Sequence, residues 1–204
     1  MPDKKTIHFY NMNADGLHKV YKNVERGVSI YFKSFFEPES KILEIGFGTG
    51  RDLSTLNNES LSANGVEASI SMLNIATKNY PELAIRVWLD TLPYLKSIED
   101  ESYDAVLCSA VLMHIDEYEM PLAIKNIARI IVTGGKLLIS IPSMRDDIDK
   151  ETLRDRYGRL YNNYSSRLYL ELFKLAGFRL LFQEENKDAM KRSFTWITMG
   201  FIKE

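Results

Sequence analysis

The chain has 204 residues, of which 45% are hydrophobic and 26% charged, values that fit one α/β domain with a buried core. Its formal net charge of −2 gives no overall attraction to nucleic acid or to an anionic membrane, and no apolar run approaches the ~20 residues that span a bilayer. The polar N-terminus lacks the apolar core of a signal peptide, and the single cysteine, Cys108, excludes an internal disulfide framework, so a cytoplasmic location is predicted. The histidines His8, His18 and His114 lack metal-ligand spacing, and no metal site is predicted.

Apolar side chains recur at three- and four-residue steps from Leu17 to Phe35, which predicts a helix over 16–36 that Pro38 ends. Further along the chain, the pattern predicts strands over 41–46, 63–67, 84–89, 103–108, 136–141, 178–183 and 193–202, and helices over 50–59, 69–79, 118–131 and 165–177. Such alternation of strands and helices is typical of a parallel sheet with helices on both faces.

The last two predicted strands are separated by only about nine residues. That is too short for a helical crossover and indicates an antiparallel pair. The predicted fold class is therefore α/β: a three-layer α-β-α sandwich with a mostly parallel seven-stranded sheet and an antiparallel last strand. Residues 1–204 are predicted to form a single domain.

Residues 143–164 form the longest irregular segment, and ten of these 22 residues are charged, five of each sign. A loop of this length inside a compact domain is usually functional or disordered. We expect residues 143–164 to form a lid together with the N-terminal arm and helix of residues 1–38. A solvated connection is the default interpretation, and contact of its arginine and tyrosine side chains with a polar substrate is the alternative.

An apolar strand, Ile42–Ile45, leads directly into Gly46-Phe47-Gly48-Thr49-Gly50, and a helical pattern follows. Glycine lets the backbone approach a ligand closely, and the following helix N-terminus offers free N–H groups. A nicotinamide-binding loop usually has the spacing Gly-x-Gly-x-x-Gly, whereas here the third glycine comes one residue early. Glu67, at the end of the next strand, fits either nucleotide, because a carboxylate accepts hydrogen bonds from both ribose hydroxyls.

Four features are found together: Glu44-x-Gly46-x-Gly48-x-Gly50, Glu67, Asp90 after the third strand, and the terminal pair of strands. This combination resembles the class I S-adenosylmethionine-dependent methyltransferases. The resemblance covers about 38–142 through motifs and 165–204 through element order. It implies a Rossmann-like fold with S-adenosylmethionine as cofactor.

The resemblance also implies a role for individual residues. The glycine loop would pass under the methionine and ribose, Glu67 would hold the ribose hydroxyls, and Asp90 would accept from the adenine amino group. The implied cofactor-binding residues are Tyr10, Glu44, Gly46, Phe47, Gly48, Gly50, Glu67, Ala68, Met72, Asp90, Thr91, Leu92, Cys108, Ser109 and Met113. Tyr10 is expected in an extended arm, either closing over the methionine end or packing as an ordinary arm residue.

Methyl transfer from a sulfonium is an in-line displacement, and it needs a base only if the acceptor loses a proton. The sequence therefore assigns no catalytic residue. His114 is a candidate base, with structural packing as the alternative, and Arg26 either pairs with the cofactor carboxylate or is a solvated surface residue.

The predicted function is methyl transfer to a small-molecule acceptor, with no nucleic acid or membrane partner. Two alternatives are a non-catalytic S-adenosylmethionine-binding regulatory or partner protein and an NAD-dependent Rossmann enzyme. The acceptor and the oligomeric state are not specified by the sequence.

Overall fold

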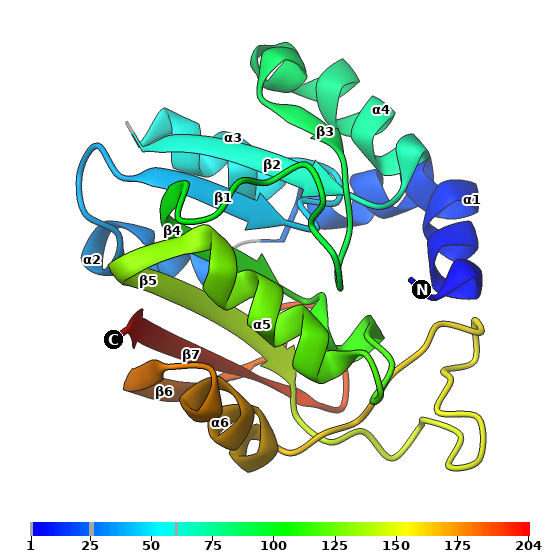
Figure 1. The fold of residues 1–204 in the computed structure, drawn as a ribbon. Helices are drawn as coiled ribbons and strands as arrows, with labels where there is room; N and C mark the ends of the chain where they lie inside the picture. Colours follow the sequence, from blue (N-terminus) through cyan, green and yellow to red (C-terminus); the bar gives the residue numbers. More distant parts are fainter. Residues whose placement is uncertain (1, 25–26, 60) are drawn as a thin grey trace.

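The computed structural model describes residues 2–24, 27–59 and 61–204. In this part of the chain, seven strands form one sheet in the order β3-β2-β1-β4-β5-β7-β6 (Figure 1). The strands are β1 (Lys41–Ile45), β2 (Ser62–Glu67), β3 (Val87–Leu89), β4 (Tyr103–Ser109), β5 (Ile131–Pro142), β6 (Phe178–Lys187) and β7 (Thr195–Lys203). Strands β1 to β5 pair in parallel, and β7 is antiparallel to both β5 and β6. The predicted fold class is confirmed.

Helices cover both faces of the sheet. They are α1 (Lys4–Tyr21), α2 (Phe32–Phe35), α3 (Arg51–Asn58), α4 (Ile70–Asn79), α5 (Met120–Ile130) and α6 (Ser166–Leu175), with 3₁₀ turns η1 (Val28–Tyr31), η2 (Pro81–Ile85) and η3 (Leu112–His114). Alternate residues of a strand face opposite sides. Val106 and Cys108 of β4 therefore pack with α5 and α6, while Ala105 and Leu107 pack with α2 and α3. No helix among the described residues is both long and apolar enough to cross a bilayer.

The first helix lies earlier in the chain than predicted. Helix α1 begins at Lys4, where the Asp3 carboxylate accepts hydrogen bonds from the backbone N–H and the hydroxyl of Thr6. The prediction of one helix over 16–36 is wrong, and Tyr10 lies within a helix and not in an extended arm. Residues 25–26 lie outside the described residues, and with them the expectation for Arg26.

The apolar repeat that suggested one helix belongs to two separate packing surfaces. Leu17 of α1 packs near Met72 and Ile75 of α4, whereas Phe32 and Phe35 are buried against the sheet in the core that includes α3. The three- and four-residue spacing continues by coincidence from α1 into η1 and α2. Apolar spacing alone does not show which part of the protein each residue contacts.

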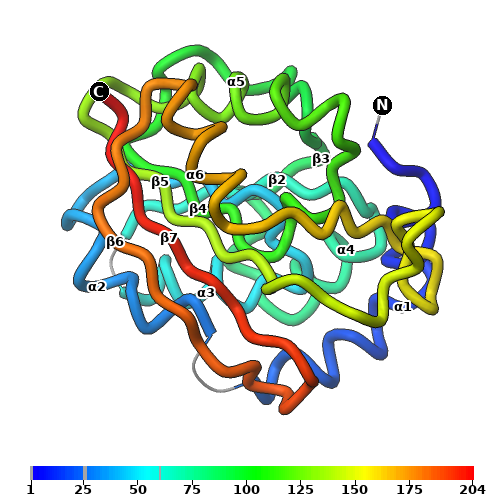
Figure 2. The backbone as a smooth tube through the Cα atoms, turned by 90° about the horizontal axis from the view of Figure 1, so that it is seen from below, coloured from blue at the N-terminus to red at the C-terminus, as the bar shows by residue number. Residues whose placement is uncertain are grey.

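Segment 143–164 follows β5 and lies beside α1 in both views of the backbone (Figures 1 and 2). Arg154 forms an ion pair of 2.8 Å with Asp3, and the backbone N–H of Leu160 donates to the Thr6 hydroxyl at 2.9 Å. The segment is therefore attached to the beginning of α1 by side-chain contacts, although it contains no helix and only one isolated strand bridge, between Arg154 and Leu160.

Candidate active site

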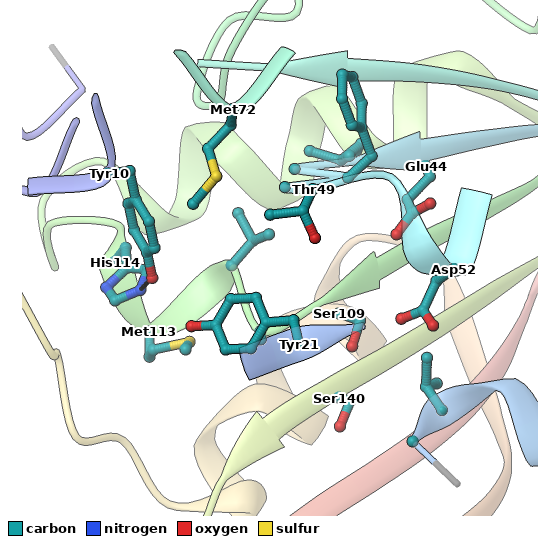
Figure 3. A pocket seen from close by; sticks show the side chains of 18 of the residues that line it. Tyr10, Tyr21, Glu44, Thr49, Asp52, Met72, Ser109, Met113, His114 and Ser140 are labelled. Carbon is teal, nitrogen blue, oxygen red and sulfur yellow. Dashed lines mark hydrogen bonds between the residues drawn. The ribbon is translucent and has the colours of Figure 1, made fainter. Parts of the chain in front are cut away.

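A cavity of about 560 Å³ lies at the carboxyl ends of the parallel strands, between the sheet, α1 and the segments that follow β4 and β5 (Figure 3). This is where open α/β sheets bind their ligands. The structure brings together most of the residues predicted for the site: Tyr10, Glu44, Gly46, Phe47, Gly48, Glu67, Ala68, Met72, Asp90, Thr91, Leu92, Ser109, Met113 and His114 all line the cavity.

Two residues predicted to bind the cofactor do not line the cavity. Cys108 is fully buried in the core on the α5–α6 side, because it alternates with Ser109 and so faces away from the site. Gly50 has a φ of +86°, and a Cβ there would come within 2.9 Å of Ala76 on α4. Gly50 is therefore required for close packing of the loop against α4, and these two expectations are corrected.

The backbone of the glycine loop forms one wall of the cavity. Gly48 has a φ of +57°, and a Cβ built on it meets no heavy atom within 4 Å. Gly46 has a φ of +70°, and its Cβ would lie 2.4 Å from Val111. The ring of Phe47 is buried near Gly65 of β2, so its backbone and not its ring contributes to the wall. Gly48 is thus the position where a ligand can approach the backbone most closely.

Glu67 joins the glycine loop to the beginning of α4. One carboxylate oxygen accepts from the Gly48 N–H, and the other accepts from the N–H groups of Ala68 and Ser69, each at 2.9 Å. Burial raises the pKa of Glu67, and these three hydrogen bonds oppose that rise. The oxygen that Gly48 contacts keeps a free lone pair, which can accept from a ribose hydroxyl.

Asp90 and the residues after it also line the cavity. Asp90 accepts from the backbone N–H of Thr91 at 2.7 Å and of Ser97 at 2.8 Å, so its carboxylate shapes the turn after β3. Apolar surface from Met72 and Leu92 lies nearby in the same cavity. One Asp90 oxygen accepts only from Thr91 and retains capacity for an adenine amino group.

Glu44 supplies a carboxyl group that lacks a protein partner. Its side chain is 3% exposed, it faces the cavity, and its Oε2 atom has no hydrogen-bond partner among the described residues (Figure 3). Burial raises the pKa of Glu44 well above its usual value, and the charge of Asp52 raises it further. A buried acceptor of this kind fits an ammonium group, such as that of the methionine part of the cofactor.

Sequence reasoning did not identify Arg51 and Asp52 as part of the site. They form an ion pair of 2.8 Å at the beginning of α3, and both line the cavity beside Glu44. Arg51 also donates to the backbone carbonyl of Tyr21 at 3.5 Å, which connects α3 to the end of α1. Both residues could have been predicted from the sequence, because they follow the glycine loop directly. The first turn of α3 must therefore lie beside any ligand that the loop binds.

Tyr10 and His114 form a hydrogen-bonded pair at the lid side of the cavity (Figure 3). The Nδ1 atom of His114 lies 2.6 Å from the carbonyl oxygen of Leu160, which can only accept, so Nδ1 carries a proton. In the neutral ring, Nε2 is then the acceptor for the Tyr10 hydroxyl at 2.9 Å. Burial lowers the pKa of His114 to about 4. His114 is therefore a neutral imidazole with its basic nitrogen directed to Tyr10.

Arg159 supports this pair from the segment after β5. Its guanidinium donates to the Asp155 carboxylate at 2.6 and 2.9 Å, and to the Tyr10 hydroxyl at 3.3 Å. The rings of Phe9 and Tyr161 also lie within 5.4 Å of the guanidinium carbon. Arg156, in contrast, is exposed and stacks on Tyr157 outside the cavity. Of these two arginines, only Arg159 lines the cavity.

Lowering the pH should weaken the fold through His114. Below pH 6.5 the unfolded chain takes up a proton on this histidine that the folded chain, with a pKa of about 4, does not, so the free energy of unfolding falls by up to about 1 kcal/mol per pH unit. Urea unfolding between pH 7 and 4.5 should show a shallower decline in His114→Gln than in the parent. His8→Gln, at an exposed position on α1, should match the parent. Equal pH slopes in all three proteins would contradict this assignment.

Other residues that were not among the predicted cofactor-binding residues also line the cavity, among them Tyr21, Ser140, Tyr161, Trp196 and Thr198. Tyr21 comes from the end of α1, Ser140 from β5, Tyr161 from the segment after β5, and the last two from β7. Among the described residues there is no cluster of histidine, cysteine or carboxylate side chains that could hold a metal ion.

This arrangement can hold a nucleoside bound to an amino acid. It offers Glu67 for ribose, a free acceptor on Asp90 for a base, open backbone at Gly48, and Glu44 for an ammonium group. The family model of the methyltransferase domain matches residues 17–183, and the chain belongs to this family. The protein is an S-adenosylmethionine-dependent methyltransferase, as the sequence predicted.

Three relatives illustrate the similarity. An "Uncharacterized methyltransferase" of Geobacillus thermodenitrificans is 22% identical over 207 residues, which cover 96% of this chain and 92% of the relative. The "Probable tRNA methyltransferase 9B" of Bos taurus is 30% identical over 109 residues, 53% of this chain but 22% of the relative. The crystal structure of Burkholderia thailandensis 1,6-didemethyltoxoflavin-N1-methyltransferase has a TM-score of 0.78 at 15% identity and covers 98% of this chain and 87% of that one.

Proposed function

We propose that the protein transfers the methyl group of S-adenosylmethionine to a small-molecule acceptor. The observation that carries the proposal is the covering of the cavity by α1 and segment 143–164. Asp3–Arg154, Thr6–Leu160 and Tyr10–Arg159 contacts join these two segments across it. A folded macromolecule would have to separate them to reach the methyl donor, whereas a small molecule fits beneath them. The similar Burkholderia enzyme was crystallised with a small heterocycle and S-adenosylhomocysteine, which supports this reading.

The residues divide between cofactor and acceptor. Glu67, Asp90, Glu44 and the backbone at Gly48 would hold the cofactor, which supplies a methyl group already activated as a sulfonium. Ser109 lines the same cavity. For methyl transfer, the acceptor and the methyl donor must meet in line and without water between them. The lid of α1 and segment 143–164 would exclude that water.

A proton from the acceptor has a defined path in this site. As the new bond forms, the acceptor proton can pass to the Tyr10 oxygen while the Tyr10 proton passes to Nε2 of His114. The lowered pKa of His114 keeps Nε2 free to accept in the resting protein. Arg159, which donates to the Tyr10 hydroxyl, would hold the phenol in place.

The destination of the methyl group tests the proposal. Protein incubated with methyl-labelled S-adenosylmethionine should transfer label to a small molecule from a metabolite extract, and not to total tRNA or to a protein fraction. Tyr10→Phe should lower the transfer at least tenfold, because the proton path is lost, while affinity for S-adenosylhomocysteine stays within threefold, less than 1 kcal/mol. Tyr157→Phe, on the outer side of the lid, is the matched control. Label in tRNA or protein alone would overturn the proposal.

A further inference from the structure

Three hydroxyl side chains lie in one row on the floor of the acceptor half of the cavity. Ser109 of β4 is in register with Ser140 of β5, and Ser140 is in register with Thr198 of β7, so the three side chains share one face of the sheet. All three line the cavity. Figure 3 shows Ser109 and Ser140 on neighbouring strands.

Ser140 lacks a protein partner in this row. It is 6% exposed, and its hydroxyl has no hydrogen-bond partner among the described residues. Because Ser140 lines the cavity, its hydroxyl is free to bond to a ligand there. The Ser109 hydroxyl also has no partner among the described residues. Adjacent hydroxyls of this kind can both donate to and accept from a ligand.

The two arginines that line this half of the cavity are each paired with a carboxylate, whereas Lys187 lines the cavity with an exposed side chain. Arg159 pairs with Asp155 at 2.6 Å, and Arg192 pairs with Asp188 at 2.5 Å. Burial raises the pKa of Asp188, but hydrogen bonds from Arg192 and Trp196 hold it at about 2, so this carboxylate remains ionised. Neither arginine offers an uncompensated charge to an acceptor.

The aromatic side chains here are already in contact with cations. Arg159 lies 5.4 Å from the centre of the Tyr161 ring, and Arg192 lies 5.8 Å from that of Trp196. Arg145 lies 4.4 Å from the Tyr161 ring as well. A guanidinium uses the negative face of a ring, and a second cation nearby is repelled by the first. These rings are suited to an uncharged conjugated group.

We infer that the acceptor is an uncharged, planar conjugated molecule with an amide-like edge that is bound by Ser109, Ser140 and Thr198. The plane of such a molecule packs against Trp196 and Tyr161, and its edge supplies both the donor and the acceptor that the hydroxyls need. The inference rests on the proposed small-molecule function and names the class of molecule at the same site. It assigns Ser140 the role of a specificity residue.

Three indole derivatives of equal size and different charge test the inference: indole-3-carboxamide is neutral, indole-3-carboxylate is an anion, and 3-(aminomethyl)indole is a cation. Their affinities are measured by calorimetry on the full chain saturated with S-adenosylhomocysteine. The carboxamide is expected to bind at least tenfold more tightly than the other two. Ser140→Ala should reduce carboxamide affinity at least fivefold and leave S-adenosylhomocysteine affinity within twofold. Ser40→Ala, at the other end of the sheet, is the matched control.

Tighter binding of the anion or the cation, no binding of the carboxamide at millimolar concentration, or equal carboxamide affinity in Ser140→Ala and the parent would each overturn the inference. These outcomes leave the proposed function intact, because that is judged separately by where the methyl label goes. Transfer of label only to tRNA or protein would remove the proposed function, and this inference with it.

Discussion

A Gly48→Val variant is expected to fold and to lose at least a hundredfold in affinity for S-adenosylhomocysteine, about 2.7 kcal/mol. The space beside the Gly48 α-carbon is open to the cavity, with no heavy atom within 4 Å of a Cβ built there. A branched side chain would therefore occupy the space that the cofactor needs. Calorimetric titration measures the affinity, and circular dichroism checks the fold.

The same substitution also strains the backbone, because φ at Gly48 is +57°. Gly177→Val provides the matched control, since Gly177 has a φ of +87° and equally open surroundings but lies after α6, away from the cavity. Both variants should lose a similar amount of stability, of the order of 1–2 kcal/mol. Only Gly48→Val should lose binding, and unchanged binding would show that the loop does not contact the cofactor.

Glu67→Ala is expected to weaken S-adenosylhomocysteine binding by about 1.5–3 kcal/mol, at least tenfold. The carboxylate would lose its contact with the ribose, and its three backbone hydrogen bonds would be lost too. The melting temperature should therefore fall as well, since those bonds join the glycine loop to α4. The sequence alone predicts the loss of binding, but it does not predict the fall in melting temperature.

Two further variants separate the causes. Glu67→Gln keeps one accepting oxygen for Ala68 and Ser69 but presents an N–H₂ group to the Gly48 N–H, so it should bind the cofactor as poorly as Glu67→Ala while recovering part of the stability. Glu99→Ala, at an exposed position, should behave as the parent in both measurements. If Glu67→Ala bound S-adenosylhomocysteine as tightly as the parent, Glu67 would be a structural residue only.

Local features of the sequence were sufficient to predict that the glycine loop, Glu67 and Asp90 line one cavity. The glycine loop, Glu67 and Asp90 each follow a strand that its own apolar residues identify, and parallel strands place their carboxyl ends at one edge. These residues could therefore be predicted as neighbours without a structure. Two residues predicted for this part of the site do not line the cavity. The side chain of Cys108 points into the core, and Gly50 packs closely against α4.

The side of the cavity formed by β5, β7 and α1 depended on contacts that join distant parts of the chain. Ser140 and Thr198 come together because β7 inserts between β5 and β6, an order that no local pattern specifies. Tyr10 meets His114 because α1 begins at Lys4, whereas the apolar repeat pointed to a helix further along.

The sequence by itself thus determined the fold class and the cofactor, because strand periodicity and the glycine spacing act over a few residues. Only the tertiary structure decided which residues line the rest of the cavity. Their positions depend on strand order and on the packing of α1 against segment 143–164, where the backbone N–H of Leu160 donates to the Thr6 hydroxyl across 154 positions of the chain.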